Sequence, residues 1–220
     1  MLNGLIKLLI LTPPILLALV IHEVAHGWVA WVLGDPTPKA AGRLSPNPLR
    51  HLDPLGTVVF FITAWMGSGI GWAKPVPVNP GFFRSPRRGM MWVSAAGPAA
   101  NFLAAVALAL VFRALIELGL FRHYATWKDM LAAMLEVGVY VNLVLGMFNL
   151  LPIPPLDGSG IVAGLLPEQA AASYRALGRY GLVVVLALIV LPGWVPGLPD
   201  LVGLVVVGPA RAISGWLLPV

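Results

Sequence analysis

Long apolar runs separated by short polar links dominate the hydrophobic pattern of the chain. The apolar stretches span residues 2–33, 55–72, 90–120, 130–151, 180–191 and 201–220. A helix needs about 20 consecutive apolar residues to cross a bilayer, and the longest of these runs reach that length. The pattern therefore predicts an all-α polytopic membrane protein, a bundle of about five to six membrane segments.

Two parts of this pattern predict irregular structure. The stretch 55–72 is short for a span, contains the sequence GSGIG, and has basic residues on both sides. Because Lys and Arg concentrate in cytoplasmic loops, we predict a re-entrant hairpin with both ends on the cytoplasmic side. Such backbone is tolerated in a membrane if it is buried in protein or lines a water-filled cavity. The polar, turn-rich link before it predicts a short β-hairpin near residues 37–50.

No internal repeat, charge run or polar appended region divides the chain. We therefore expect a single integral membrane domain over residues 1–220. Its core should occupy about residues 1–160, and additional C-terminal membrane segments should lie within residues 176–220.

The composition agrees with a membrane protein and narrows the expected partners. Hydrophobic residues make up 59% of the chain, charged residues only 10%, and the mean hydropathy is +0.88, far from the balance of a soluble domain. The net charge of +5 comes from basic residues in short links, where they are topology signals rather than a nucleic-acid patch. The lipid bilayer is thus an expected partner, and nucleic acid is not. Since the chain has no cysteine, any metal must be held by His, Asp or Glu.

The first apolar run contains HEVAH, which puts His22, Glu23 and His26 where a membrane helix normally carries apolar residues. Residues four apart share one helix face, so both imidazoles can reach one metal ion while Glu23 projects beside them. An ionisable group inside a membrane helix costs about 2.5–3.5 kcal/mol, so three within one turn indicate a function. The alternative interpretation is a buried polar cluster, or the proton relay of a transporter.

A catalytic zinc site commonly has three protein ligands, so a further His, Asp or Glu is needed. Asp157 stands out, because the proline-rich sequence PIPP breaks the helix before it and lets its carboxylate turn into the bundle. If the basic links are cytoplasmic, Asp157 returns to the membrane depth of the histidines. Its alternative interpretation is an ordinary turn. Glu117 and Glu136 are left as possible intramembrane partners.

Asparagines in the apolar segments are further candidates. Asn149 lies two turns before the aspartate, where its amide can donate to a substrate carbonyl or bind an extended substrate backbone. Alternatively, it satisfies backbone groups that the prolines free. Asn101 is expected to hydrogen-bond between helices, with Asn142 as its partner.

Several sequence pieces occur in a fixed order: HEVAHGWVAWVLGD, GRLSPNPLRHLDPLGT, GWAKPVPVN, AGPAANF and FNLLPIPPLDG. In this combination the chain resembles the site-2 protease family of intramembrane zinc metalloproteases. It is similar to the compact prokaryotic branch without PDZ or CBS domains. The resemblance implies a core formed by the first, third and fourth apolar segments. It also implies a hairpin over residues 42–53 that presents an extended substrate.

The same resemblance implies a role for each candidate residue. His22, His26 and Asp157 would bind one zinc ion. Glu23 would act as the catalytic base, and Asn149 would contact the substrate near the scissile bond. The active site would lie within the plasma membrane, near its cytoplasmic side.

Together, residues and resemblance predict an intramembrane zinc metalloendopeptidase. It would hydrolyse a peptide bond in or near a transmembrane segment of a membrane protein or peptide, as in regulated intramembrane proteolysis. The oligomeric state is left open. A membrane transporter or channel for metal ions or protons is the alternative, because it also needs ionisable side chains inside the membrane. An inactive scaffold with the same fold is a third possibility.

Overall fold

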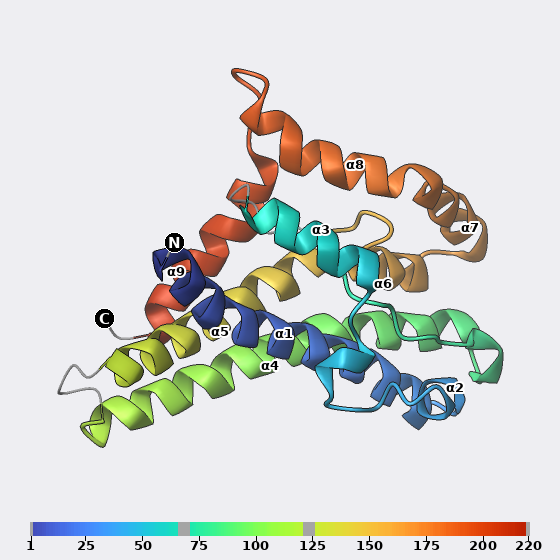
Figure 1. Ribbon diagram of the computed structural model, residues 1–220. Coiled ribbons are helices and arrows are strands. Elements are labelled where there is room, and N and C mark those ends of the chain that lie inside the picture. Colours follow the sequence, from blue (N-terminus) through green and yellow to red (C-terminus); the bar gives the residue numbers. More distant parts are fainter. Residues whose placement is uncertain (1, 66–70, 121–125, 219–220) are drawn as a thin grey trace.

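The computed structural model describes residues 2–65, 71–120 and 126–218, and its regular elements are helices (Figure 1). The longer helices are α1 (Leu2–Val32), α3 (Pro54–Trp65), α4 (Pro86–Glu117), α5 (Thr126–Asn149), α6 (Asp157–Leu165), α7 (Glu168–Ala176), α8 (Gly178–Val190) and α9 (Gly208–Leu217). Shorter helical pieces are α2 (Thr37–Ala40), η1 (Pro48–Arg50), η2 (Pro80–Phe82), η3 (Leu191–Gly193) and the π-helical η4 (Gly203–Val207). The predicted all-α membrane class is confirmed.

Helices α1, α4 and α5 form the core of the molecule, since each of them packs against the other two (Figure 1). They are the first, third and fourth apolar segments, so the core implied by the family resemblance is confirmed. The largest apolar cluster joins Ala105 and Ala109 of α4 with Val139 and Leu143 of α5. Small residues on α4 allow this close approach of the two helices.

Among the described residues, three helical stretches are long and apolar enough to cross a membrane: Leu8–Val32, Pro86–Glu117 and Lys128–Asn149. A fourth span exists if α7 and α8, bent by 57° relative to each other, are counted as one. The described residues therefore do not support the prediction of about five to six membrane segments. Helices α3 and α8 are apolar but have only 12 and 13 residues. At 1.5 Å per residue each covers about 20 Å, short of a hydrocarbon core of about 30 Å.

The predicted β-hairpin near residues 37–50 is also wrong. This link folds into the helical turn α2 and the 3-10 turn η1, and the described part of the chain contains no strand. The one isolated antiparallel bridge recorded there joins Leu52 to Ala73. Prolines at the start of both helical pieces favour helical turns over a strand ladder.

Side chains replace the strand ladder in satisfying backbone groups of this link. Arg43 donates to the carbonyl oxygen of Arg50. The Arg50 side chain donates to the Gly42 carbonyl oxygen at 3.1 Å, and His51 Nε2 donates to the Ser45 carbonyl oxygen at 2.8 Å. These three side chains thus satisfy carbonyl groups that a strand ladder would otherwise engage.

The predicted re-entrant hairpin over residues 55–72 is described only in part. Its first arm is α3, and residues 66–70 lie outside the described residues. The two ends meet, because Leu52 bridges Ala73 and the Lys74 N–H donates to the His51 carbonyl oxygen at 2.8 Å. Entry of this segment into the membrane stays a prediction.

The C-terminal helices differ in how closely they join the core. Helix α6 packs on α4, α7 packs on α6, and α9 returns to α5. Helix α8 packs chiefly on α7 and η3, and it lies apart from the three-helix core (Figure 1). The division into a core of about residues 1–160 and C-terminal segments within residues 176–220 stays a prediction.

Candidate metal centre and active site

His22 and His26 lie one turn apart on α1, where the spacing of four residues puts both on one face of the helix. Their Nε2 atoms are 3.0 Å apart, and the two rings are nearly perpendicular at 86°. His22 is buried and His26 is half-buried. Two ring nitrogens thus converge on one point inside the bundle.

Acceptors on α4 determine which nitrogen of each imidazole carries the proton. His22 Nδ1 lies 2.7 Å from Asn101 Oδ1, and His26 Nδ1 lies 2.6 Å from the Val93 carbonyl oxygen. The Asn101 amide nitrogen donates to Asn142 Oδ1 at 2.8 Å and to an α1 carbonyl at 3.1 Å, so its own Oδ1 accepts. Both Nδ1 atoms therefore hold the proton, and both Nε2 atoms present a lone pair. The predicted pairing of Asn101 with Asn142 is confirmed.

One face of α4 is shaped to receive the two histidines. Val93, Gly97 and Asn101 recur every four residues and share that face. A β-carbon at Gly97 would lie 2.5 Å from His26 Nε2 and 2.6 Å from His22 Cε1, closer than atoms can approach. Close packing between helices at Gly97 and Pro98 was expected from the sequence, but the bond from His26 to the Val93 carbonyl was not. The spacing of four residues that links Val93, Gly97 and Asn101 was the available signal.

Asp157 reaches the histidines from the break in the chain after α5. Helix α5 ends at Asn149, residues 150–156 form turns, and α6 begins at Asp157. An acidic residue in the first turn is favoured by the helix dipole. Asp157 Oδ2 lies 3.0 Å from His22 Nε2 and 3.3 Å from His26 Nε2. The structure thus brings these three side chains together, and we name them the metal group.

The metal group fits a divalent cation. Its ligand atoms all lie within 4.8 Å of one another. Because neither Nε2 carries a proton, the buried Asp157 Oδ2 has no hydrogen-bond donor among the described residues. A buried acceptor in that state costs about 1–3 kcal/mol, and a cation removes the cost. Two imidazole nitrogens and one carboxylate oxygen form a donor set that zinc accepts, with one position left for water or substrate.

Glu23 follows His22 on α1, but its carboxylate contacts a different part of the chain. Glu23 Oε2 accepts a hydrogen bond from the backbone N–H of Val76 at 3.1 Å. Val76 lies in the proline-rich segment 73–79 between α3 and α4. We name residues 35–53 and 73–79 together the loop layer. The metal group thus faces the helices α4 and α6, whereas Glu23 faces the loop layer.

Asp35 ties the two parts of the loop layer together. Its carboxylate accepts from the Thr37 N–H at 2.9 Å and from the Asn79 N–H at 2.7 Å. Burial alone would raise the pKa of Asp35, but hydrogen bonds from the Thr37 hydroxyl and from these two amides hold the pKa below its ordinary value of 3.8. The ionised carboxylate is therefore the form that the fold stabilises.

Asn149, the predicted substrate contact, is the last residue of α5. Its amide nitrogen donates to the Leu145 carbonyl oxygen at 3.0 Å, within its own helix. Within the described part of the chain no hydrogen bond joins Asn149 to the metal group, and its role stays a prediction. Glu117 and Glu136, the alternatives for the third ligand, lie outside the metal group.

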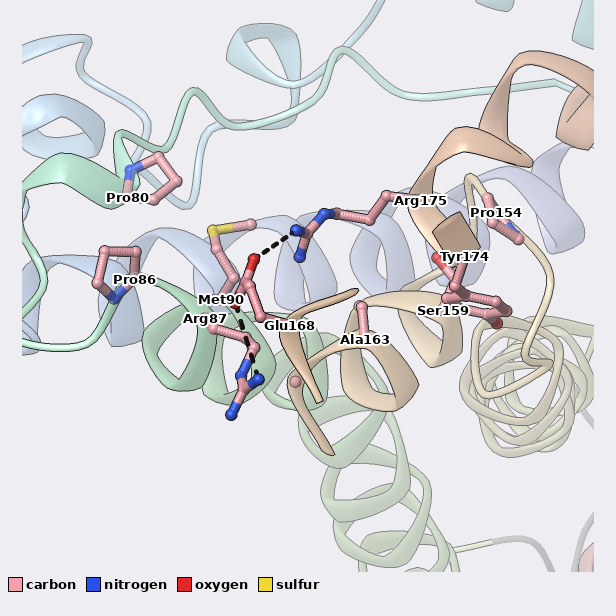
Figure 2. Close-up of a pocket in the computed structure, with 12 residues that line it drawn as sticks. Pro80, Pro86, Arg87, Met90, Pro154, Ser159, Ala163, Glu168, Tyr174 and Arg175 are labelled. Atoms are coloured by element: carbon pink, nitrogen blue, oxygen red, sulfur yellow. Dashed lines mark hydrogen bonds and ion pairs between the residues drawn. The ribbon is translucent and has the colours of Figure 1, made fainter. Parts of the chain in front are cut away.

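A cavity of about 720 Å³ opens beside α6, bounded also by the start of α4 and by α7 (Figure 2). Figure 2 shows Glu168 between two arginines, 3.0 Å from Arg175 and 3.7 Å from Arg87. The rest of the lining is largely apolar, and it includes Ser159. The members of the metal group do not line this cavity, although Ser159 comes only two residues after Asp157. The cavity is thus a separate recess, within one turn of α6 from the metal group.

Known proteins resemble this chain over most of its length. The model of peptidase family M50 matches residues 114–191, which include Asn149 and Asp157. YwhC of Bacillus subtilis, named as a candidate zinc metalloprotease, is 40% identical over 185 residues, which are 81% of this chain and 78% of YwhC. This chain belongs to peptidase family M50, the site-2 proteases. The resemblance and the enzyme class predicted from the sequence are confirmed.

Other relatives carry the same description as YwhC. Rip2 of Mycobacterium tuberculosis is 34% identical over 192 residues, covering 81% of this chain and 67% of Rip2. Rip2 of Mycolicibacterium smegmatis is 32% identical over 180 residues, covering 80% of this chain and 65% of that relative. No solved structure matched the chain. This site-2 protease is a multi-pass membrane zinc metalloprotease, and its metal group can hold the implied metal.

Proposed function

We propose that this site-2 protease hydrolyses peptide bonds in or near transmembrane segments of membrane proteins. One observation carries the proposal: two imidazole lone pairs and a carboxylate oxygen converge between helices of membrane-spanning length. A carboxylate follows on the same helix. Ionisable groups are retained at such depth where they serve a function, and this combination suits hydrolysis.

In this proposal His22, His26 and Asp157 hold one zinc ion. When bound, zinc supplies Lewis acidity, which makes a water molecule a stronger acid and a carbonyl carbon a better electrophile. The hydrogen bonds from His22 and His26 to α4 keep both Nε2 lone pairs available for that ion. Supporting evidence is the fit of the donor set to zinc.

Glu23 acts as the general base and then as the general acid. It takes a proton from the attacking water, whose oxygen forms the new bond to the scissile carbonyl carbon. When the C–N bond breaks, Glu23 gives that proton to the leaving amine nitrogen. The bond from Val76 engages Oε2 of Glu23, so Oε1 is the oxygen available for the proton.

The substrate segment has to unwind before cleavage, because helical carbonyls are already bonded within the helix. Asn149 uses one amide hydrogen in its bond to Leu145, and we assign the second hydrogen to an unwound substrate carbonyl. A membrane protein or peptide is thus the partner, together with the bilayer. Release of a membrane-tethered domain, as in regulated intramembrane proteolysis, is the expected outcome.

The charge pattern supports an active site near the cytoplasmic side of the plasma membrane. Basic residues concentrate in the link between α1 and α4 and around α7, at Lys39, Arg43, Arg50, Lys74, Arg84, Arg87, Arg88, Arg175 and Arg179. Short loops rich in Lys and Arg stay in the cytoplasm. Glu23 and both histidines of the metal group lie in the half of α1 nearest to these links.

The proposal is tested by Glu23→Gln in the full-length protein, reconstituted with a membrane peptide substrate. Loss of a general base should lower cleavage by about 10²–10⁴-fold, with zinc content by elemental analysis unchanged. Glu117→Gln, at the far end of α4, is the matched control and should cleave normally. Cleavage by Glu23→Gln at the wild-type rate would contradict the proposal. Ion flux in proteoliposomes without proteolysis would favour the transporter instead.

A further inference from the structure

A buried arginine, Arg43, hydrogen-bonds to the peptide unit that contacts Glu23. Arg43 is only 6% exposed. Its Nη2 donates to the Pro75 carbonyl oxygen at 3.3 Å, and its Nη1 donates to the Arg50 carbonyl oxygen. The ion pairs among the described residues do not include Arg43. Burying a charge is costly unless it is compensated, so the position of this guanidinium needs a reason.

One peptide unit links Arg43 to the carboxylate of Glu23. The Pro75 carbonyl and the Val76 N–H belong to the same planar peptide group. The carbonyl oxygen accepts from Arg43, and the N–H donates to Glu23 Oε2 at 3.1 Å. A cation and a carboxylate thus lie at the favourable ends of one peptide dipole. Hydrogen bonds arranged in series polarise and strengthen one another.

The sequence around this peptide unit restricts the contact to one donor. Residues 74–79 are KPVPVN, and proline has no backbone N–H. Val76 is therefore the only backbone donor among residues 75–77. No neighbouring amide can take its place if the segment shifts by one residue.

A glycine on α1 allows the loop layer to approach Glu23. Gly27 lies four residues after Glu23 and so shares its helix face. A β-carbon at Gly27 would lie 2.9 Å from Leu44 Cδ2 and 3.3 Å from Val76 Cγ1. Leu44 directly follows Arg43. The contact of Leu44 at Gly27 therefore brings Arg43 to the face of α1 that carries Glu23.

We propose that Arg43 is a positioning residue for Glu23 and acts through the Pro75–Val76 peptide unit. The inference rests on the proposed role of Glu23 as the base. Arg43 holds the peptide, the peptide engages Oε2, and Oε1 stays directed for proton transfer. Without Arg43 the carboxylate samples other orientations, so kcat falls while KM and zinc content stay as they are.

The kinetic test is a double-mutant cycle in the full-length, zinc-loaded protein with a membrane peptide substrate. Arg43→Gln removes the donor to the carbonyl, and Val76→Pro removes the N–H. We expect each variant to lower kcat about 10-fold, and the double variant to fall by about 10-fold as well, because both break one linked contact. The matched control is Arg84→Gln, an exposed arginine outside the loop layer, which should leave kcat unchanged.

A second readout needs no activity. Hydrogen–deuterium exchange of the Val76 amide should speed up in Arg43→Gln and in Glu23→Gln, but not in Arg84→Gln. The flanking prolines carry no amide, so the signal of this segment comes from few positions. Exchange at the wild-type rate in Arg43→Gln would overturn the proposal.

Kinetic outcomes also separate the alternatives. If kcat of the double variant falls by about 100-fold, the two residues act independently. If Arg43→Gln loses zinc, Arg43 has a general structural role. Either result overturns the proposal. A rise of kcat in Val76→Pro means that the contact restrains Glu23, which also overturns it. If Arg43→Gln does not fold, Arg43→Lys replaces it in the same cycle, with the same criterion. If Glu23→Gln cleaves normally, the role of Glu23 fails instead, while the exchange result still tests the contact.

Discussion

The metal group and the loop layer lie on two sides of the same turn of α1, yet they are held in different ways. The metal group sits on helices, and its histidines are oriented by acceptors on a neighbouring helix. The loop layer is held by side chains bonded to backbone groups, among them those of Asp35, Arg43 and His51. Metal binding should therefore depend on helix packing, whereas orientation of Glu23 should depend on the links. Changes in one region should leave the other intact.

The largest effect is expected from Asp157→Ala, which removes one of the three ligands of the metal group. Losing a residue that only hydrogen-bonds to a metal ligand lowers metal affinity about 10–100-fold. Losing a ligand itself should lower zinc affinity further, so the purified variant should retain almost no zinc by elemental analysis. Asp129→Ala, in the first turn of α5, is the matched control. Wild-type zinc content in Asp157→Ala would remove this residue from the site.

A smaller effect on the same region is expected from Asn101→Ala. This change removes the acceptor of His22 Nδ1, so the ring is no longer held in one tautomer. Zinc affinity, measured by competition with a chelator, should fall about 10–100-fold. Asn142→Ala leaves that acceptor in place and should lower affinity less. Equal losses in both variants would mean that the asparagine pair acts only through packing.

The smallest effect is expected in the loop layer, from Asp35→Asn. Because hydrogen bonds hold the pKa of Asp35 below 3.8, its ionised form stabilises the fold above that pH, and the stabilisation disappears as the pH falls through the lowered pKa. At pH 7 the variant should melt about 2–4 °C lower, with unchanged zinc content.

The difference in Tm between wild type and Asp35→Asn should shrink as the pH falls below 3.8. Both proteins are compared without metal, so that protons competing for the zinc ligands do not contribute. A difference that stays constant at every pH at which the protein folds would contradict the assigned charge state. A loss of zinc in the variant would contradict the independence of the two regions.

The helical core and the gathering of the metal group were predictable because both follow from periodicity and chain direction. A spacing of four puts His22 and His26 on one face, and the prolines before Asp157 end α5 where the chain has returned to that depth. The number of spans was not predictable from apolarity alone. An apolar stretch indicates contact with lipid or core, while crossing also requires length. Within the described residues, neither α3 nor α8 reaches that length by itself.

The remaining misses involve backbone atoms, which every residue has. The Val93 carbonyl holds His26, and the Val76 N–H contacts Glu23, yet neither side chain signals such a role. The β-hairpin failed for a related reason. Residues 37–50 have turn chemistry that suits either a hairpin or helical turns, and bonds from Arg43 and His51 to distant carbonyls decided between them.

Gly97 has a consequence for how relatives of this protein are classified. Its missing side chain allows α1 and α4 to approach, because a single methyl group there would lie within 2.6 Å of atoms in both imidazole rings. A descendant could therefore keep His22, Glu23, His26 and Asp157 and still lose its metal. A search that checks only for His22, Glu23, His26 and Asp157 would classify such a chain as active. The residue at position 97 belongs in the signature that separates working members from silent ones.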